Sequence, residues 1–203
     1  MEMSQPYLYV HPVSGADREA AAELLGRGMA DNPVHVMAYG GDDRSRAHRH
    51  AQLMRTLLRS SPSLRIEGVH RGEALAGIAA WAPPGHCRPP ATTRLRLLGR
   101  ALTYGPGTAS RLLSWNRRWA RHDPDEPHVH LGPVSVDRHL RGRGIGGLLL
   151  LRHVQRLDAT GVEGYLETDR PEAVGFYERF GYVVVDEADV LGAPTWFMRR
   201  PVV

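Results

Sequence analysis

Residues 129–146 read VHLGPVSVDRHLRGRGIG and place an apolar segment before a loop rich in glycine and arginine. An apolar run with helical spacing, GLLLLRHVQRL, follows at residues 147–157. A strand, a glycine-rich loop and a helix N-terminus in this order are typical of a pyrophosphate site. Glycine lets the backbone approach the ligand, the free N–H groups donate to phosphate oxygens, and the helix dipole favours negative charge. The loop therefore predicts a phosphorylated ligand, and the elements after it indicate which one.

Length and composition predict one globular domain over residues 1–203. The chain is 42% hydrophobic and 24% charged, and 203 residues are enough for one sizeable core. The opening MEMSQPYLYVHP has no basic region followed by an apolar run, so no signal peptide is expected. The longest strictly apolar runs, such as 148–151, are too short to cross a bilayer. We therefore expect no membrane contact and, by default, a cytoplasmic location.

All 26 basic residues are arginine, and the formal net charge is +4. Without lysine the chain cannot form a Walker phosphate loop, which excludes that class of nucleotide hydrolase. The modest positive charge suits an anionic cofactor, whereas a nucleic-acid binder would carry a denser basic stripe. The arginines of residues 94–121 are most simply a solvated helix face. The single cysteine, Cys87, excludes an internal disulfide and any zinc pattern built on several cysteines.

Hydrophobic spacing and turn residues predict alternating helices and strands around a mixed sheet, so the fold class is α/β or α+β with three layers. A Gly-Gly-Asp-Asp loop is expected at 40–43, and Leu112, Leu113, Trp115 and Trp119 are candidates for a buried helix face. The predicted helices span residues 16–29, 44–59, two segments within 93–121, 145–160 and 171–180. The predicted strands span residues 7–11, 64–70, 74–81, 128–136, 162–168, 182–186 and 196–199.

Two alternatives compete for the phosphate loop. Gly142-x-Gly144-x-x-Gly147 matches the dinucleotide-binding pattern, and Glu167 stands near the position of the ribose-binding acid. Against this, residues 137–141 separate the motif from its strand, and only one further βαβ unit would follow. The other alternative is a surface loop without a ligand, because glycine-rich turns are common. The loop alone does not decide between these interpretations.

The loop together with later segments resembles one known family. Arg141-x-x-Gly144-x-Gly146, preceded by Val134-Ser135-Val136, resembles the coenzyme A loop of the GNAT N-acetyltransferases. YLET at 165–168 and FYERFGY at 176–182 resemble the second half of that family's domain, and a looser likeness reaches residues 29–33, 80–83 and 195–198. The resemblance implies a GNAT-like mixed, mostly antiparallel central sheet with helices on both faces, and acetyl-CoA as the cofactor.

The resemblance also implies how acetyl-CoA is held. The strand at 131–136 would pair with the pantetheine arm as a neighbouring strand does, and a backbone N–H there would polarise the thioester carbonyl. The loop N–H groups would hold the pyrophosphate, and Arg141 and Arg143 would add charge. The cofactor-binding residues implied are Val134, Ser135, Val136, Arg141, Gly142, Arg143, Gly144, Ile145, Gly146 and Phe176. One departure is Ala173, where many family members carry an asparagine that helps to hold the cofactor arm.

The family's reaction is a direct attack of an amine on the acetyl thioester in a ternary complex. By resemblance, Tyr177 is the general acid that protonates the leaving thiolate; the alternative, which its place in FYERFGY disfavours, is that the ring only packs. Glu167 is the leading side-chain candidate for the base; a structural carboxylate or a water chain are the alternatives. His128 and His130 share one strand face and could relay a proton. Two histidines without a third ligand are weak support for zinc, so no metal is expected.

The acceptor implied by the resemblance is a primary amine of a small molecule, and the expected state is a monomer or a homodimer. We expect the acceptor site between the first two helices and the loop at 31–43, with Tyr39, Trp81, Trp115 and Trp119 as aromatic candidates and Asp31, Asp42 and Asp43 to attract an ammonium group. A protein or peptide N-acetyltransferase is an alternative that would use the same catalytic half. A non-catalytic acyl-CoA-binding module is another.

Overall fold

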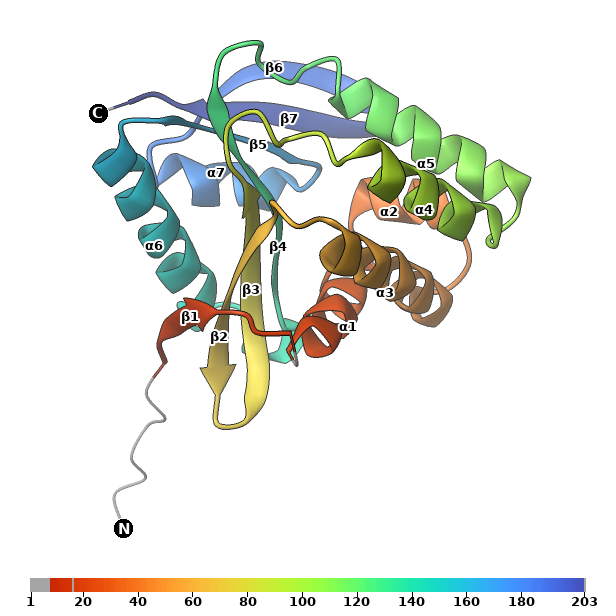
Figure 1. The fold of residues 1–203 in the computed structure, drawn as a ribbon, viewed down its shortest axis with the longest axis horizontal. Helices are drawn as coiled ribbons and strands as arrows, with labels where there is room; N and C mark the ends of the chain where they lie inside the picture. Colours follow the sequence, from red (N-terminus) through yellow and green to blue (C-terminus); the bar gives the residue numbers. More distant parts are fainter. Residues whose placement is uncertain (1–7, 16, 203) are drawn as a thin grey trace.

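The computed structural model describes residues 8–15 and 17–202. Within them, seven strands form one sheet in the order β1-β2-β3-β4-β5-β7-β6 (Figure 1). β4 and β5 run parallel, and the other neighbouring strands described are antiparallel. The bounds are β1 Val10–Pro12, β2 Arg65–Arg71, β3 Ala74–Ala82, β4 His128–Val136, β5 Glu163–Thr168, β6 Val183–Val190 and β7 Ala193–Arg200. The predicted mostly antiparallel sheet is confirmed, and a doubly wound dinucleotide fold is excluded because it needs a parallel sheet.

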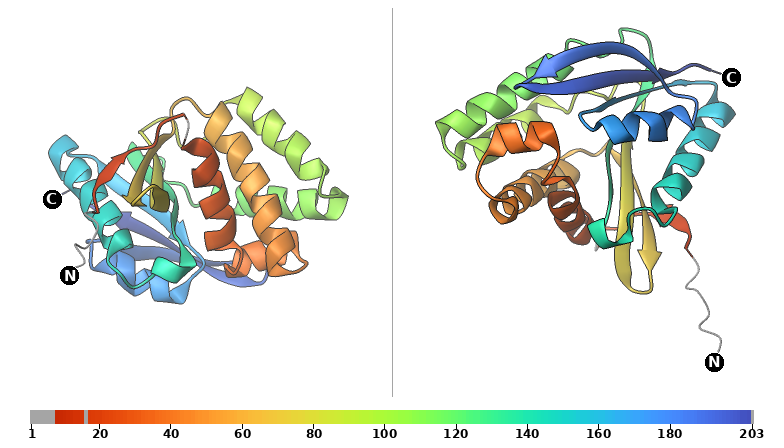
Figure 2. Two further views of the ribbon diagram at one scale, coloured as in Figure 1. Left: turned by 90° about the horizontal axis from the view of Figure 1, so that it is seen from below. Right: turned by 180° about the vertical axis from the view of Figure 1, so that it is seen from behind.

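Helices cover both faces of the sheet (Figure 2). α1 and α3 pack on one face against β2 and β3, and α6 and α7 pack on the other. α4 and α5 form an outer layer over α2 and α3. The bounds are α1 Arg18–Met29, α2 Pro33–Tyr39, α3 Asp43–Ser60, α4 Ala91–Leu102, α5 Pro106–Trp119, the 3-10 turn η1 Arg138–Leu140, α6 Ile145–Thr160 and α7 Pro171–Glu178.

Most predicted elements lie close to where the sequence placed them, although β7, predicted from residue 196, begins at Ala193. The segment 33–39, expected to be part of a loop, is the helix α2. β6 continues beyond the predicted end at 186 to Val190, where it turns into β7. Leu113, expected on a buried face, is 38% exposed, whereas Leu112 is buried. The starts predicted at Tyr7 and Ala16 lie outside the described residues.

α2 forms because a distant residue caps its first turn. Pro33 occupies the first helical position, where its missing N–H costs nothing. The Asp169 carboxylate, after the end of β5, accepts from the Val34 N–H at 2.8 Å and from Asn32 Nδ2 at 3.1 Å. This contact spans more than 130 residues of chain, so local sequence rules could not have found it. Among the described residues, no helix is both long and apolar enough to cross a membrane.

Candidate functional site

β4 and β5 separate soon after they meet. Their parallel pairing runs from His128↔Glu163 to His130↔Tyr165, and within the described chain no pair between them follows. On the other side of β4, Trp81 pairs with Leu131 and Ala79 with Val134, so two β4 residues stand opposite one β3 residue. Such a bulge bends its strand. The result is an open backbone edge on β4 at residues 131–136, which Figure 1 shows as the divergence of the two strands.

The glycine–arginine loop and the N-terminus of α6 lie beyond the open edge. Gly142 and Gly144 have φ of 75° and 81°, a region that glycine enters without steric cost. The N–H of Leu148 donates to Gly144 at the first turn of α6, so the N–H groups of the three residues before Leu148 have no partner within the helix. Residues 141–144 are exposed, while the Ile145 side chain is buried in the core. The loop thus presents free N–H donors to solvent.

Two of the predicted cofactor residues hold neighbouring elements in place. Arg141 donates to the Gly28 carbonyl at 2.6 Å and lies 3.7 Å from the Asp31 carboxylate, which ties the loop to the end of α1. Ser135 is buried on β4, and a Cβ on Gly28 would collide with its Oγ, so α1 and β4 are in close contact. Arg143 is exposed on the loop. Val134 and Val136 flank Ser135 on the open part of β4 and pack against the α6 side of the core.

Phe176 and Tyr177 approach the same region from α7. The Phe176 ring packs against the start of α6, where a Cβ on Gly146 would lie 3.4 Å from Cζ. The Tyr177 ring stands edge-on to Phe176, with ring centroids 5.3 Å apart. Burial, with a smaller effect of the Asp169 charge, raises the pKa of Tyr177 to about 12. The phenol therefore keeps its proton at any working pH, which is the form that a general acid needs.

Glu167 is paired with His130 across the two separating strands. The Glu167 side chain is 4% exposed, and its Oε2 lies 2.8 Å from His130 Nε2. Burial opposes the charged imidazole, but the Glu167 carboxylate, with Cys87 and Asp123, outweighs it and holds the pKa of His130 well above its usual range. The two residues form a buried charged pair at the point where β4 leaves β5. The sequence placed both residues near the site but did not predict the contact.

Cys87 joins this pair from the proline-rich connector between β3 and α4. Its Sγ lies 3.2 Å from His128 Nε2, and His128 Nδ1 in turn lies 2.8 Å from the Glu126 carbonyl oxygen. Burial disfavours the thiolate, but the hydrogen bonds to His128 and His130 outweigh the effect of burial and lower the pKa of Cys87 to about 7. The sequence interpretation missed this contact because Cys87 precedes His128 by 41 residues and matches no cysteine motif.

A cavity of about 330 Å³ lies beside these residues. Its wall includes His130 and Gly132 of β4, Cys87 of the connector, and residues at the end of α3 such as Leu57 and Ser61. It therefore opens next to the Glu167–His130 pair, where the two strands part. Its position differs from the acceptor region expected near residues 31–43.

The residues expected to form the acceptor site have other partners. Asp31 is paired with Arg138 and Arg170, each at 3.2 Å, in addition to Arg141. Asp42 caps α3, and Asp43 pairs with Arg46 and Arg138. The aromatic candidates belong to packed regions: Tyr39 is buried against His50, Trp81 lies under Arg156 on the α6 side, and Trp115 and Trp119 pack edge to face. The acidic residues of the expected acceptor region are thus engaged in ion pairs or a helix cap, and its aromatic candidates are packed, as the helical spacing of Trp115 and Trp119 had favoured.

Comparison with known sequences agrees with this arrangement. The sequence model of the acetyltransferase (GNAT) family matches residues 105–182, which hold β4, the loop, α6, β5 and α7. A mycothiol acetyltransferase of Gordonia bronchialis is 36% identical over 88 residues. That match covers 41% of this chain and only 27% of the length of the relative.

Solved structures share the whole fold. A structure described as histone acetyltransferase HPA2 and related acetyltransferase, from Corynebacterium glutamicum, superposes with a TM-score of 0.71 at 21% identity and covers 97% of both chains. An agmatine N-acetyltransferase superposes with a TM-score of 0.60 at 17% identity, covering 95% of this chain and 98% of its own. At such identities the likeness concerns the fold. The GNAT family model matches residues 105–182, less than half of the chain, and the solved structures share the fold of that family, whose members use acetyl-CoA as the acetyl donor.

Proposed function

We propose that this protein transfers the acetyl group of acetyl-CoA to a primary amine of a small molecule. The observation that carries the proposal is the opening between β4 and β5, with phosphate-binding donors at one end and the Glu167–His130 pair at the other. The match to the GNAT family over this segment supports the same reaction class.

The open edge and the loop fit the two halves of coenzyme A. The segment 134–136 pairs with β3 on one side and leaves its other side open, where its outward backbone groups suit the amides of a pantetheine arm. The N–H groups from Gly142 to Gly146, with the exposed Arg143, suit a pyrophosphate. Arg141 supports the loop from behind through Gly28 and Asp31. Phe176 shapes the helix start, and Ala173 offers no amide to the arm, so the backbone donors carry more of the binding.

Tyr177 and Glu167 take the two proton roles. When bound, acetyl-CoA supplies the acetyl thioester. Tyr177 donates its phenol proton to the departing sulfur, and its raised pKa keeps that proton in place until then. Glu167 accepts the proton that the amine must lose, because an aliphatic amine is mostly protonated at neutral pH, and His130 holds the Glu167 carboxylate in place.

The cavity of about 330 Å³ beside His130 is the proposed acceptor site. A volume of about 330 Å³ lies in the range of small-molecule pockets, which favours a small acceptor. Segments 29–33, 80–83 and 195–198 resemble puromycin N-acetyltransferase, which favours an aromatic amine. The structural relative that acts on agmatine favours a small amine too, whereas the one described as a histone acetyltransferase keeps a protein acceptor as the alternative.

The test is calorimetric titration with acetyl-CoA and with NADH, followed by a free-thiol assay over an amine panel that includes puromycin, agmatine and a histone-tail peptide. The proposal requires acetyl-CoA binding and thiol release that depends on a small amine. Tyr177→Phe should lower kcat by about 100-fold or more while acetyl-CoA affinity stays within about threefold, because only the proton donor is lost. Tyr9→Phe, at an exposed position, is the control. Full activity of Tyr177→Phe would remove Tyr177 as the acid.

A further inference from the structure

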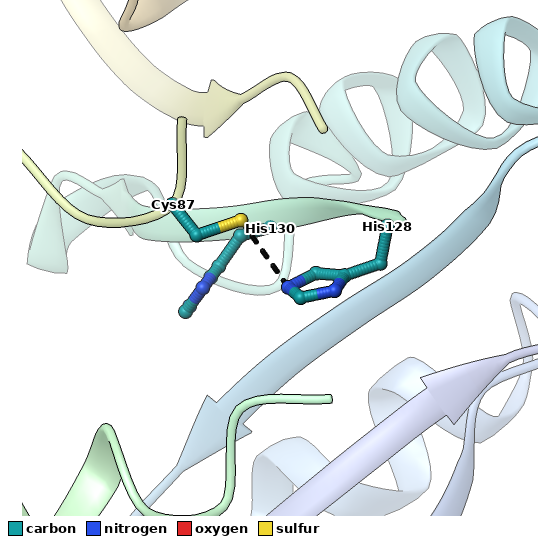
Figure 3. A group of neighbouring side chains, drawn as sticks. All are labelled: Cys87, His128 and His130. Atoms are coloured by element: carbon teal, nitrogen blue, oxygen red, sulfur yellow. Dashed lines mark hydrogen bonds between the residues drawn. The ribbon is translucent and has the colours of Figure 1, made fainter. Parts of the chain in front are cut away.

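Three metal-binding side chains meet where the connector crosses β4. Cys87, His128 and His130 each bring one ligand atom to within 4.8 Å of the others. Figure 3 shows Cys87 hydrogen-bonded to His128, with His130 beside them on the strand that carries His128. His128 and His130 project to one face because side chains in a strand alternate. The cluster thus joins two segments that are distant in sequence.

Both imidazole rings are oriented as metal ligands are. A metal-bound histidine usually donates its other ring N–H to a carboxylate or a backbone carbonyl. His128 Nδ1 lies 2.8 Å from the Glu126 carbonyl oxygen, and His130 Nε2 lies 2.8 Å from Glu167 Oε2. The nitrogens left for a metal are therefore Nε2 of His128, which now shares a hydrogen bond with Cys87 Sγ, and Nδ1 of His130; a bound ion would take the place of any proton on them. His130 Nδ1 is buried and, in the part of the chain that the structure describes, has no hydrogen-bond partner.

We propose that Cys87, His128 and His130 bind one Zn²⁺ ion, with a fourth position open to the cavity. Thiolate and imidazole ligands suit Zn²⁺ and do not suit Ca²⁺ or Mg²⁺. Bond lengths of about 2.3 Å to sulfur and about 2.0–2.1 Å to nitrogen place tetrahedral S and N ligands about 3.5 Å apart. Cys87 Sγ and His128 Nε2 are 3.2 Å apart, so a small outward shift admits the ion.

The surroundings of the cluster leave room for the fourth ligand. Cys87 and His130 both line the cavity of about 330 Å³, from which a water or an acceptor molecule could reach the ion. Asp123 Oδ1, 3.7 Å from His130 Nδ1, supplies negative charge next to the site. The ion would fasten the connector to β4 and so hold one wall of the cavity. The site does not depend on the proposed acetyl transfer, and acetyl-CoA binding at the loop is a separate property.

The experiment measures Zn²⁺ binding by untagged, chelator-treated protein in competition with a chromophoric chelator. Wild type should bind one equivalent. Cys87→Ser and His128→Gln should weaken binding by more than the about 10- to 100-fold that loss of an outer-shell partner causes. His48→Gln, on an exposed part of α3, is the matched control and should bind as wild type does. Circular dichroism and thermal unfolding of each variant verify that it folds.

Co²⁺ gives a second measurement that reports the ligands themselves. The wild-type Co²⁺ complex should show a near-ultraviolet thiolate-to-metal band, and Cys87→Ser should lack it. The proposal is overturned if wild type and the two variants bind Zn²⁺ alike, if wild type binds none, or if no thiolate band forms. Acetyl-CoA titration of the same samples keeps a failure of this site separate from a failure of the proposed reaction.

Discussion

His153 predicts a loss of stability in mild acid. The residue lies on the inner face of α6, is 1% exposed, and its Nε2 lies 2.9 Å from the Tyr182 hydroxyl. Burial, with repulsion from Arg156 and Arg200, lowers the pKa of His153 to about 3. In the unfolded chain the same ring has a pKa of about 6.5. The folded protein therefore excludes a proton that the unfolded chain accepts.

The size of the effect follows from the difference between the two pKa values. Below about pH 6.5 the unfolded chain binds the proton and gains stability, so the free energy of unfolding falls as the pH falls, down to about pH 3. Each pH unit inside that window costs about 1.4 kcal/mol for one such group. Between pH 7.5 and pH 5.0, His153 lowers the free energy of unfolding almost only below pH 6.5, which gives a loss of about 2 kcal/mol.

Urea unfolding of wild type and His153→Gln at pH 7.5 and pH 5.0 isolates this contribution. Glutamine keeps a hydrogen-bonding group near Tyr182 and does not titrate, so wild type should lose about 2 kcal/mol more than the variant over this pH interval. Other titrating groups cancel in the comparison. His139→Gln, at an exposed position, should keep the wild-type pH dependence. Equal losses in wild type and His153→Gln would refute the reasoning.

Further predictions concern packing and capping, and urea unfolding measures each. Gly28→Ala should destabilise the fold by about 1–3 kcal/mol, because the added methyl collides with Ser135. The matched change Gly99→Ala, in α4 with open space around the glycine, should raise the free energy of unfolding by about 0.5–1 kcal/mol. If Gly28→Ala and Gly99→Ala shifted stability in the same direction, this account would be contradicted. Asp169→Ala should cost about 1–3 kcal/mol, because the Val34 N–H at the start of α2 loses its acceptor, and an unchanged midpoint would show that α2 needs no such cap.

The parts of the fold that the sequence predicts are the helices and strands whose ends are determined by residues adjacent in the chain. α6 was predicted with its observed bounds because Gly144 and Gly161, both with left-handed backbone, flank an apolar run. The β2–β3 hairpin was predicted because a turn with Gly72 separates two apolar segments. α2 was missed because its cap is supplied from far along the chain by Asp169. β6 was predicted too short because acidic residues at 186, 187 and 189 follow its three leading valines, which hides the strand pattern in the second half.

The candidate site divides in the same way. The loop, Glu167 and Tyr177 stand in one stretch of the chain, so their order carried the closer part of the resemblance. The location of the acceptor region could not be predicted, because it depends on which helices leave space between them. Residues expected to be free there, such as Asp31, form ion pairs with arginines. Cys87 gave no signal, because a single cysteine becomes a candidate ligand only when the connector folds back onto His128.

The two nitrogens of His130 link the proposed base and the proposed metal ion. Nε2 is bonded to Glu167, and Nδ1 is the nitrogen left for Zn²⁺. A metal at Nδ1 would fix the tautomer of the ring and draw charge from it, so Glu167 would retain less capacity to take a proton from an amine. The effect of Glu167→Gln on turnover is therefore interpretable only when metal content is controlled. Turnover of Glu167→Gln should be measured with and without a chelator. An equal loss of turnover in both conditions assigns Glu167 to the proton transfer alone. A loss confined to one condition shows that the ion acts through His130.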